Sequence, residues 1–312
     1  MPPLPFTKAH GLGNDFVIID TRQNGRVPSA AEAARIADRR RGVGFDQLIV
    51  IAQPSAKGPS AKEVSAKEAA LKGAGAKGRR ANGGASSDDA GLADARLIIL
   101  NADGSEAEAC GNGTRCAAWM LMQETGRDHL LLETAAGLLD AELLADGRVS
   151  VDMGLVALDW RDIPLAKPMD TLHLDLVQGP LADPVAVNIG NPHCVFFVDD
   201  AEAIDIERLG LAIERHPLFP ARTNVEVATV LAPDRIRMRV WERGVGVTLA
   251  CGSGACATLV AAARRKLTGR HATIVVDGGE LEIEWLKDQH VRMTGPVAIS
   301  YSGTFDPSLL NG

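Results

Sequence analysis

The sequence predicts an α+β protein of two pseudo-symmetric domains, each a curved antiparallel or mixed β-sheet, or a barrel, around a central helix. Three observations lead to this fold class. Each half of the chain contains the order strand–turn–strand, helix, strands, Cys-Gly loop, helix, strands. Short strand-like runs follow one another at regular spacing, as in curved or closed sheets. The strongest helix of each half contains a small apolar segment, AAWMLM or ATLVAAA, which suits the interior of such a sheet.

The first half opens with two strands in residues 6–20, joined by a turn rich in Gly and Asn. Residues 29–42 predict a helix, because Ser29 and Glu32 fit a capping box and Gly42 fits a C-terminal stop. The remaining elements of this half are a strand in 45–53, a strand in 95–104, a helix from 114 to 126, and strands in 129–137, 138–147 and 148–154.

The second half repeats this order after an irregular, Pro-containing stretch at 154–168, which marks a candidate domain boundary. We therefore expect an N-terminal domain of residues 1–154 and a C-terminal domain of residues 155–295. The elements of the second half are two strands in 185–199, a helix in 204–216, two strands in 223–244, a helix in 254–269, and strands in 272–279, 281–286 and 290–300.

Residues 54–94 differ sharply from their surroundings, because they are rich in Ala, Lys, Gly and Ser and have almost no large apolar side chains. Such a segment cannot bury enough surface to offset the entropy of ordering it. A strand resumes directly after it. We interpret the segment as a disordered insertion in a loop between two strands, without a function of its own.

Composition and charge argue against several classes of function. The 312 residues are 46% hydrophobic and 23% charged, which is ordinary for a globular protein. The net charge of −7 and the aromatic content of 4% argue against a nucleic-acid or anionic-membrane partner. No apolar run approaches the ~18 residues that a membrane-spanning helix needs.

The expected compartment is the cytoplasm. The N-terminal sequence MPPLPFTKAHGLGND lacks the long apolar core of a signal peptide. The five cysteines would then remain reduced, and their odd number and spacing do not suggest a disulfide framework.

The most informative motif occurs twice, as CGNGTRC at 110–116 and as CGSGAC at 251–256. Cys110 and Cys251 each precede a predicted helix, whose N-terminus carries partial positive charge and free N–H groups. We expect this position to lower the pKa of both thiols and the glycines to bring backbone amides close to an anionic group. Two matched thiols on opposite faces of one carbon suggest a racemisation or an epimerisation.

The other cysteines, Cys116, Cys256 and Cys194, are expected to pack in the core. A zinc site is disfavoured. The x5 spacing of the first cysteine pair exceeds the C-x2–4-C spacing of zinc ribbons, and the x4 pair is only marginally permissible because its second cysteine falls within an apolar helix. Neither glycine loop matches GxGxxG after a strand or GxxxxGK[ST]. We expect neither a metal nor a cofactor.

With these residues in view, the chain resembles the diaminopimelate epimerases, a family of pyridoxal-independent amino-acid epimerases. The resemblance covers nearly the whole chain outside 54–94. It rests on HGLGNDF at 10–16, GFDQ at 44–47, NADGSEAEACGNGTRC at 101–116, GNPHCV at 190–195, TNVE at 223–226 and ERGVGVTLACGSGACA at 242–257.

The resemblance implies a cofactor-independent exchange between LL- and meso-2,6-diaminopimelate, a step toward lysine and peptidoglycan precursors. Cys110 and Cys251 match the two catalytic cysteines, one acting as thiolate and the other as thiol. It also implies a homodimer, an active site between the domains, and a last strand within 296–312 that returns to the N-terminal domain.

The resemblance further implies roles for polar residues around the cysteines. His193 and Glu242 match residues that tune the pKa of the two thiols. Arg243 forms with Glu242 a pair suited to the distal ammonium and carboxylate of the substrate. The other residues matching substrate-contact positions are Asn14, Gln47, Asn101, Gly111, Asn112, Asn191, Asn224, Gly252 and Ser253.

Three alternatives remain open at this point. A proline-racemase-like enzyme would use the same logic, although the sequence around its cysteines differs. A non-enzymatic module could use the glycine loops to bind anions. Oxidation of Cys110 and Cys251 to a disulfide would make a thiol switch, provided that their Cα atoms lie ~5.5–6 Å apart.

Overall fold

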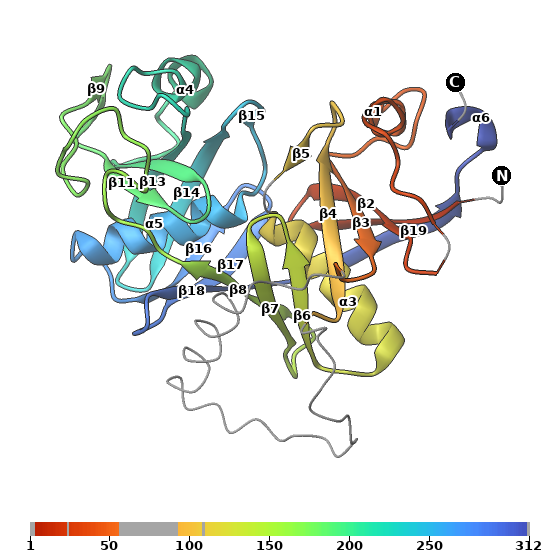
Figure 1. Cartoon of the computed structure of the whole chain (residues 1–312). Helices are drawn as coiled ribbons and strands as arrows, with labels where there is room; N and C mark the ends of the chain where they lie inside the picture. Colours follow the sequence, from red (N-terminus) through yellow and green to blue (C-terminus); the bar gives the residue numbers. More distant parts are fainter. Residues whose placement is uncertain (1–3, 24, 56–92, 108–109, 311–312) are drawn as a thin grey trace.

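The computed structural model describes residues 4–23, 25–55, 93–107 and 110–310 of the chain. Figure 1 shows two lobes side by side, each with a helix surrounded by strands. These two helices, α3 (Gly111–Thr125) and α5 (Gly252–Arg264), follow the two Cys-Gly motifs. The fold class predicted from the sequence is therefore confirmed.

The first half contains, besides α3, one helix and eight strands within the described residues. Their bounds are β1 (Pro5–Gly11), β2 (Asn14–Asp20), α1 (Ala30–Ala37), β3 (Gln47–Ala52), β4 (Ala95–Asn101), β5 (Glu106–Ala107), β6 (His129–Thr134), β7 (Gly137–Leu143) and β8 (Val149–Leu155).

The second half adds two further helices to α5. Its bounds are β9 (Val177–Gln178), β10 (Leu181–Ala182), β11 (Val185–Asn188), β12 (Pro192–Phe197), α4 (Ile206–Glu214), β13 (Asn224–Ala232), β14 (Arg235–Glu242), β15 (Gly246–Val247), β16 (His271–Val276), β17 (Gly279–Trp285), β18 (His290–Gly295), β19 (Ala298–Thr304) and α6 (Pro307–Leu310).

The strand pairing repeats between the halves. In the first half β1–β2 is antiparallel, β2–β3 parallel, β3–β4 antiparallel and β4–β6 parallel, before the antiparallel run β6–β7–β8. Strands β11, β12, β13, β14, β16, β17 and β18 follow the same sequence of pairings. The antiparallel pair β8–β18 joins the halves, so that the described residues contain one mixed sheet of 17 strands.

The last strand of the second half pairs with the first half. Strand β19 follows β18 but pairs antiparallel with β1. Ala157, just after β8, forms an antiparallel bridge with Asn188 at the end of β11. The β1–β19 pair ties the two lobes together at the level of the backbone.

The two central helices form part of one hydrophobic core. Cys116 on α3 and Cys256 on α5 are fully buried within that core, and Cys194 on β12 is fully buried in a second cluster. The prediction that these three cysteines pack in the core is confirmed. Residues at the N-terminal ends of both helices line a cavity, which is described below.

Helix α1 begins as the sequence predicts but ends earlier. Ser29 and Glu32 form the predicted capping box. The helix ends at Ala37, and Gly42 is therefore not its immediate stop. The chain instead folds back so that a Cβ on Gly42 would lie 2.4 Å from the carbonyl oxygen of Arg35. Glycine is needed there for close backbone approach, and not for the C-cap itself.

Most of the predicted insertion, residues 56–92, lies outside the described residues. Its described edges are anchored to the sheet. The backbone N–H and hydroxyl of Ser55 donate to the carboxylate of Glu133, and Asp94 accepts from the backbone of Leu131. Within the described ranges, no helix has the length and apolar character to cross a membrane.

Candidate active site

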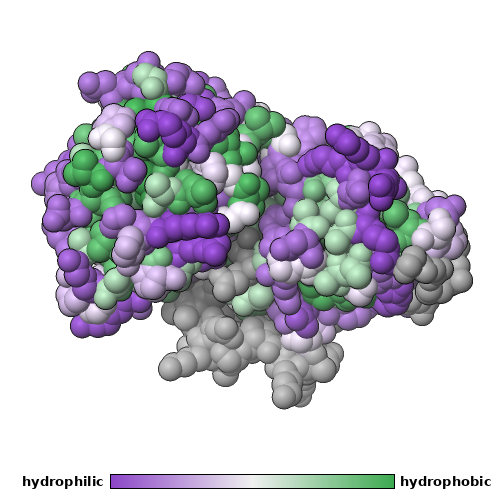
Figure 2. Space-filling model, turned by 90° about the horizontal axis from the view of Figure 1, so that it is seen from above, coloured by the Kyte–Doolittle hydropathy of each residue, from purple (hydrophilic) through white to green (hydrophobic). Residues whose placement is uncertain are grey.

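A cavity of about 780 Å³ lies between the lobes and is lined by residues of both halves. Figure 2 shows the hollow between the lobes from above. All of the site residues predicted from the sequence line this cavity except His193, which is fully buried behind it. Segments that lie far apart in the chain are thus brought to one place.

Cys110 and Cys251 occupy equivalent positions at the N-termini of the two central helices. Each is the N-cap residue, with extended backbone, of its helix. The Sγ of Cys110 accepts the backbone N–H of Gly113 at 3.3 Å, and the Sγ of Cys251 accepts that of Gly254 at 3.4 Å. Each sulfur atom thus caps its helix, and the first-turn residues Gly111, Asn112, Gly252 and Ser253 line the cavity.

The glycines after each cysteine leave room for the thiols. A Cβ on Gly113 would lie 3.3 Å from the Sγ of Cys110, and one on Gly254 would lie 3.4 Å from that of Cys251. On Gly254 it would also lie 2.9 Å from a carboxylate oxygen of Glu226. A side chain at position 113 would therefore press on the sulfur of Cys110, and one at position 254 would press mainly on the carboxylate of Glu226.

The expectation that the helix ends lower the thiol pKa values is wrong. Burial raises the pKa of Cys110 to about 12 and the pKa of Cys251 well above its usual range. The N–H groups of Gly113 and Gly254 act in the opposite direction but do not outweigh the loss of hydration.

Glu242 lies at the end of β14 and faces both thiols. Burial raises the pKa of Glu242 to about 7, against the effect of a hydrogen bond that the hydroxyl of Thr248 donates to its Oε1. The charge of this carboxylate raises the pKa of both Cys110 and Cys251. Its protonation state is therefore coupled to theirs.

Arg243, the next residue, is held at two points by its own half. Its backbone N–H donates to the Oδ1 of Asn224 at 2.9 Å, and its Nη1 donates to the carbonyl of Ala221 at 3.1 Å. Asn224 in turn donates to the carbonyl of Pro192 at 3.0 Å. The Asn224 side chain thus fixes the backbone that carries Arg243.

His193 connects a cavity residue to a buried carboxylate. Its Nε2 lies 2.8 Å from the Oδ1 of Asn191, and its Nδ1 lies 2.7 Å from the Oε1 of Glu226. Since an amide oxygen only accepts, Nε2 carries a hydrogen in this arrangement. The contact with Glu226 then holds one proton, either on the ring or on the carboxyl group, whose pKa burial raises.

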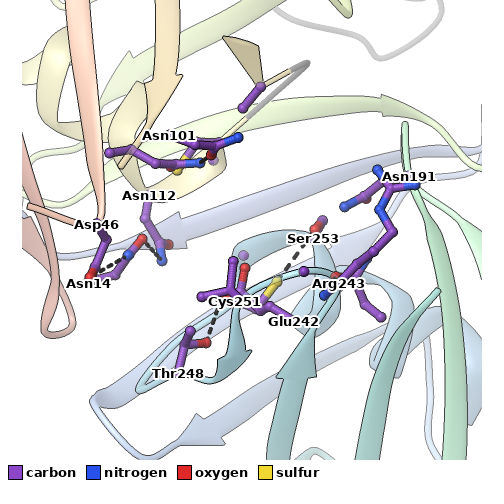
Figure 3. A pocket seen from close by; sticks show the side chains of 18 of the residues that line it. Asn14, Asp46, Asn101, Asn112, Asn191, Glu242, Arg243, Thr248, Cys251 and Ser253 are labelled. Carbon is purple, nitrogen blue, oxygen red and sulfur yellow. Dashed lines mark hydrogen bonds between the residues drawn. The ribbon is translucent and has the colours of Figure 1, made fainter. Parts of the chain in front are cut away.

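The first half contributes a network of amides on the opposite wall, as Figure 3 shows. Asn14 donates to the carboxylate of Asp46 at 2.8 Å and accepts from the Nδ2 of Asn112 at 3.3 Å. Gln47 donates to the Oδ1 of Asn101 at 3.1 Å. These side chains hold one another in place along the wall of the cavity.

Asn112 also joins the two halves. Its Nδ2 reaches the carbonyl of Ala250 at 3.3 Å, directly before Cys251 in the chain. A Cβ on Gly252 would lie 3.3 Å from its Oδ1. The loop after Cys110 therefore contacts the loop around Cys251, so that the two helix N-termini meet at the cavity.

Several cavity or supporting residues were not predicted. Asp46, Arg39 and Thr248 line the cavity, while Glu226 and Arg115 lie behind it. All except Arg39 lie within the sequence motifs named above. Membership of these motifs is the sequence feature by which they could have been predicted. Arg39 is bonded at 2.7 Å to Asp46 and also pairs with Asp15.

In the described part of the chain, no group of three or more His, Cys, Asp or Glu side chains could hold a metal ion.

Solved structures with this fold include two from different groups of proteins. A hydroxyproline epimerase from Agrobacterium vitis superimposes with a TM-score of 0.63 at 15% identity, covering 99% of this chain and 95% of that one. A phenazine biosynthesis protein of the PhzF family from Bacillus anthracis gives 0.62 at 13% identity, covering 98% and 100%. At these identities the likeness establishes the fold alone.

Sequence comparison identifies the family. The sequence-family model for diaminopimelate epimerase matches residues 6–158 and 185–300. Diaminopimelate epimerase from Rhodospirillum centenum is 51% identical, with 98% of this chain and 94% of that protein covered. Diaminopimelate epimerase from Acidiphilium cryptum is 49% identical, with 98% of both chains covered. This chain therefore belongs to the diaminopimelate epimerase family.

Proposed function

We propose that this chain interconverts LL- and meso-2,6-diaminopimelate by inverting one Cα through a cofactor-independent, two-base proton transfer. The observation that carries the mechanism is the placement of two thiols. Cys110 and Cys251 are the N-cap residues of the central helices of different halves, and both line one cavity. Inversion at one carbon needs a base on one face and an acid on the other.

In the proposed reaction one cysteine is a thiolate and the other is a thiol. The thiolate takes the Cα proton, and the electron pair of the broken C–H bond moves toward the α-carboxylate as enolate-like charge. The thiol delivers its proton to the opposite face and forms the new C–H bond. The two sulfur atoms have then exchanged protonation states, and the reverse reaction uses the exchanged roles.

The developing negative charge needs hydrogen-bond donors that are already in place. The helix N-termini of α3 and α5 supply backbone N–H groups and partial positive charge at the cavity. We propose that the α-carboxylate binds between these two ends, at Gly111, Asn112, Gly252 and Ser253.

The distal amino-acid group of the substrate would occupy the rest of the cavity. Glu242 and Arg243 offer opposite charges for a distal ammonium and a distal carboxylate. The amide side chains proposed to complete this subsite are Asn14, Gln47, Asn101, Asn191 and Asn224. A substrate without the distal group would leave the charges of Glu242 and Arg243 without a partner in the cavity and would be rejected.

We further propose that His193 and Glu242 adjust the balance between the two thiols. Glu242 titrates near neutral pH and faces both sulfur atoms. His193 acts through Asn191 and shares a proton with Glu226. The ammonium groups of the substrate would add the positive charge that favours a thiolate.

The test is conversion of LL-diaminopimelate to the meso isomer by the purified full-length chain under reducing conditions, followed by chiral chromatography. Cys110→Ala and Cys251→Ala should each abolish conversion, because each removes one of the two proton carriers. Cys194→Ala is the matched control, since this cysteine is buried away from the cavity. Absence of meso product from the unmodified chain would refute the proposal.

The same assay separates the alternatives. Inversion of proline or hydroxyproline in place of diaminopimelate would indicate a proline-racemase-like enzyme. Anion binding that persists in both cysteine variants, without turnover by the parent chain, would indicate a binding module.

We propose that residues 1–154 and 155–295 act as two domains that close over the substrate in a cytoplasmic homodimer. All five cysteines are free thiols, as a reducing compartment favours.

Strand β19 pairs only with β1 among the described strands and leaves Ile299 and Tyr301 exposed at 38% and 50%. An apolar sheet edge of this kind suits self-association. Sedimentation analysis should give twice the chain mass, and a monomer would contradict the proposed dimer.

A further inference from the structure

Glu226 is a buried carboxyl group behind the cavity, and the proposed mechanism gives it no function of its own. It lies on β13, and none of its surface is exposed. Its Oε1 lies 2.7 Å from the Nδ1 of His193, which is also fully buried. Its Oε2 is buried without a hydrogen-bond partner in the described part of the chain. A carboxyl group in such a place is costly unless its charge is neutralised, so its presence calls for an explanation.

The strand pairing places this carboxyl group beside the histidine. Strands β12 and β13 are parallel, with His193 opposite Asn224 and Val195 opposite Glu226. Since alternate residues of a strand point to the same face, His193 and Glu226 share one face of this pair. A Cβ on Gly254 would lie 2.9 Å from the Oε1 of Glu226, so α5 covers that face and its glycine leaves room for the carboxyl group.

Burial restricts where the protons of this pair can be. His193 is the ion-pair partner of Glu226 among the described residues. The pair has no net charge either as imidazolium beside carboxylate or as neutral imidazole beside carboxylic acid. In the first form both ring nitrogens carry hydrogen, and in the second the acid donates to Nδ1 and the ring hydrogen is on Nε2. The remaining form, carboxylate beside neutral imidazole, would bury a net negative charge. Nε2 therefore carries a hydrogen in both favourable forms.

The hydrogen on Nε2 decides how Asn191 is oriented. Nε2 lies 2.8 Å from the Oδ1 of Asn191, and only an acceptor can receive its hydrogen. The amide oxygen therefore faces the ring, and Nδ2 is available to donate into the cavity that Asn191 lines. The two ends of an amide have nearly the same shape, so space alone does not distinguish this orientation from the reverse.

The orientation of Asn191 matters because of what shares its wall of the cavity. Arg243 also lines the cavity, and Figure 3 shows both residues on the wall formed by the second half. A guanidinium group only donates hydrogen bonds. With Nδ2 of Asn191 as a second donor, this wall suits a carboxylate. A reversed amide would present an oxygen atom there and would repel one.

We propose that Glu226 is a positioning residue that, through His193, fixes the amide of Asn191 with its N–H groups toward the cavity and so toward a carboxylate of the substrate. This inference rests on the proposed function, which places the distal amino-acid group of the substrate at this wall. Glu226 itself does not contact the substrate. Its role depends on the protons of the pair and not on its shape, so a substitution of equal size should disturb it.

The first test observes the ring of His193 directly. The full-length chain is labelled with ¹⁵N in its histidine rings and studied by NMR at neutral pH, where protonated and unprotonated ring nitrogens give different signals. The His193→Gln protein identifies the signals of this residue by their loss. We expect Nε2 of His193 to carry a hydrogen throughout the population. An Nε2 without hydrogen would overturn the proposal without any variant at Glu226.

The second test changes the protons and keeps the size. In Glu226→Gln the new amide can donate to Nδ1 or accept from it, so both ring tautomers and both orientations of Asn191 become possible. Nε2 should then be only partly protonated. KM for LL-diaminopimelate should rise about twofold or more, because only a fraction of the protein has the competent orientation, while kcat stays close to that of the parent. The exposed Glu284→Gln is the matched control and should leave KM unchanged. An unchanged KM in Glu226→Gln, or a loss confined to kcat, would overturn the proposal.

A double-mutant cycle shows whether Glu226 acts through Asn191. Asn191→Leu removes the donor and should raise KM by about tenfold, as expected for the loss of a hydrogen bond to a charged group. Adding Glu226→Gln should then cause no further rise. An effect of Glu226 on the neighbouring Cys251 loop would instead add in full. Additive rises in KM would therefore contradict the proposed role.

These outcomes are distinguishable from failure of the proposed function. A full-length chain that makes no meso-diaminopimelate would refute that function, whereas the ring signals of His193 would still show whether the pair holds a hydrogen on Nε2. If Glu226→Gln does not fold, as judged by circular dichroism, the spectrum of the parent chain decides the question.

Discussion

A carboxylate beside a thiol that must ionise is an unfavourable neighbour, and Glu242 faces both reactive cysteines. Its pKa near 7 means that a change of one pH unit around neutrality alters the charge in the cavity. Thr248 partly offsets the burial of this carboxylate by donating to it. The residue is thus suited to respond to the protonation of the thiols.

Glu242 should also make the stability of the protein depend on pH. Its pKa rises from 4.5 to about 7 on folding, so the folded state binds more protons between these values. The free energy of unfolding should therefore fall as pH rises through this window. Glu242→Gln removes this fall and should be more stable than the parent above neutral pH, by about 2–3 kcal/mol.

Urea denaturation at about pH 5 and about pH 8 measures this effect. The exposed Glu284→Gln is the control, and its stability should follow that of the parent chain. The prediction fails if the stability of Glu242→Gln depends on pH in the same way as that of the parent chain. That result would contradict the effect of burial on this carboxylate.

The residues of the site were largely predictable, but their partners were not. The six motifs named the cavity residues because those segments resemble a known family. The pairing of His193 with Glu226 joins positions 33 residues apart, and nothing in either local sequence specifies the other. The thiol pKa values depend on burial, which a sequence pattern does not measure.

At the scale of elements, both central helices begin at a cysteine and end differently. The C-cap of helix α3 is Gly126, whose left-handed backbone (φ 68°) closes the helix. The C-cap of helix α5 is Arg265, whose backbone is right-handed helical. The predicted stop at Gly126 is confirmed, because local glycine chemistry is sufficient to set it.

Gly126→Ala should destabilise the protein by about 1 kcal/mol, since a Cβ is strained in left-handed backbone even where space is open. The control is Gly269→Ala, which also meets no atom within 4 Å but does not have positive φ. That variant should stay within about 0.5 kcal/mol of the parent. Equal midpoints for the two variants in chemical denaturation would show that the C-cap contributes nothing.

The long strands and helices follow from hydrophobic periodicity, whereas the two-residue strands do not. Strands β5, β9, β10 and β15 are too short to show a period of two. Helix α1 shows that the end of a helix can also be unpredictable from local sequence. Ser29 predicts its start through a local cap, but its end at Ala37 depends on a tertiary fold-back at Gly42.

At the scale of the whole molecule, duplication supplies one thiol from each half. The β8–β18 and β1–β19 pairs hold the halves in one sheet. The repeated order of elements predicted the two similar lobes. That they share a single continuous sheet could not be predicted, since the pairing of β8 with β18 joins segments more than a hundred residues apart.

The central claim is that two different groups exchange protons with the two faces of one carbon. Turnover of LL-diaminopimelate in D₂O, sampled at the earliest measurable conversion by mass spectrometry, tests it most directly. The account predicts that meso product carries deuterium at the inverted Cα while the remaining LL substrate stays unlabelled, because the acid that delivers the new proton has exchanged with solvent. Product that retains the original hydrogen would mean that a single base carries the proton across, and would contradict the account.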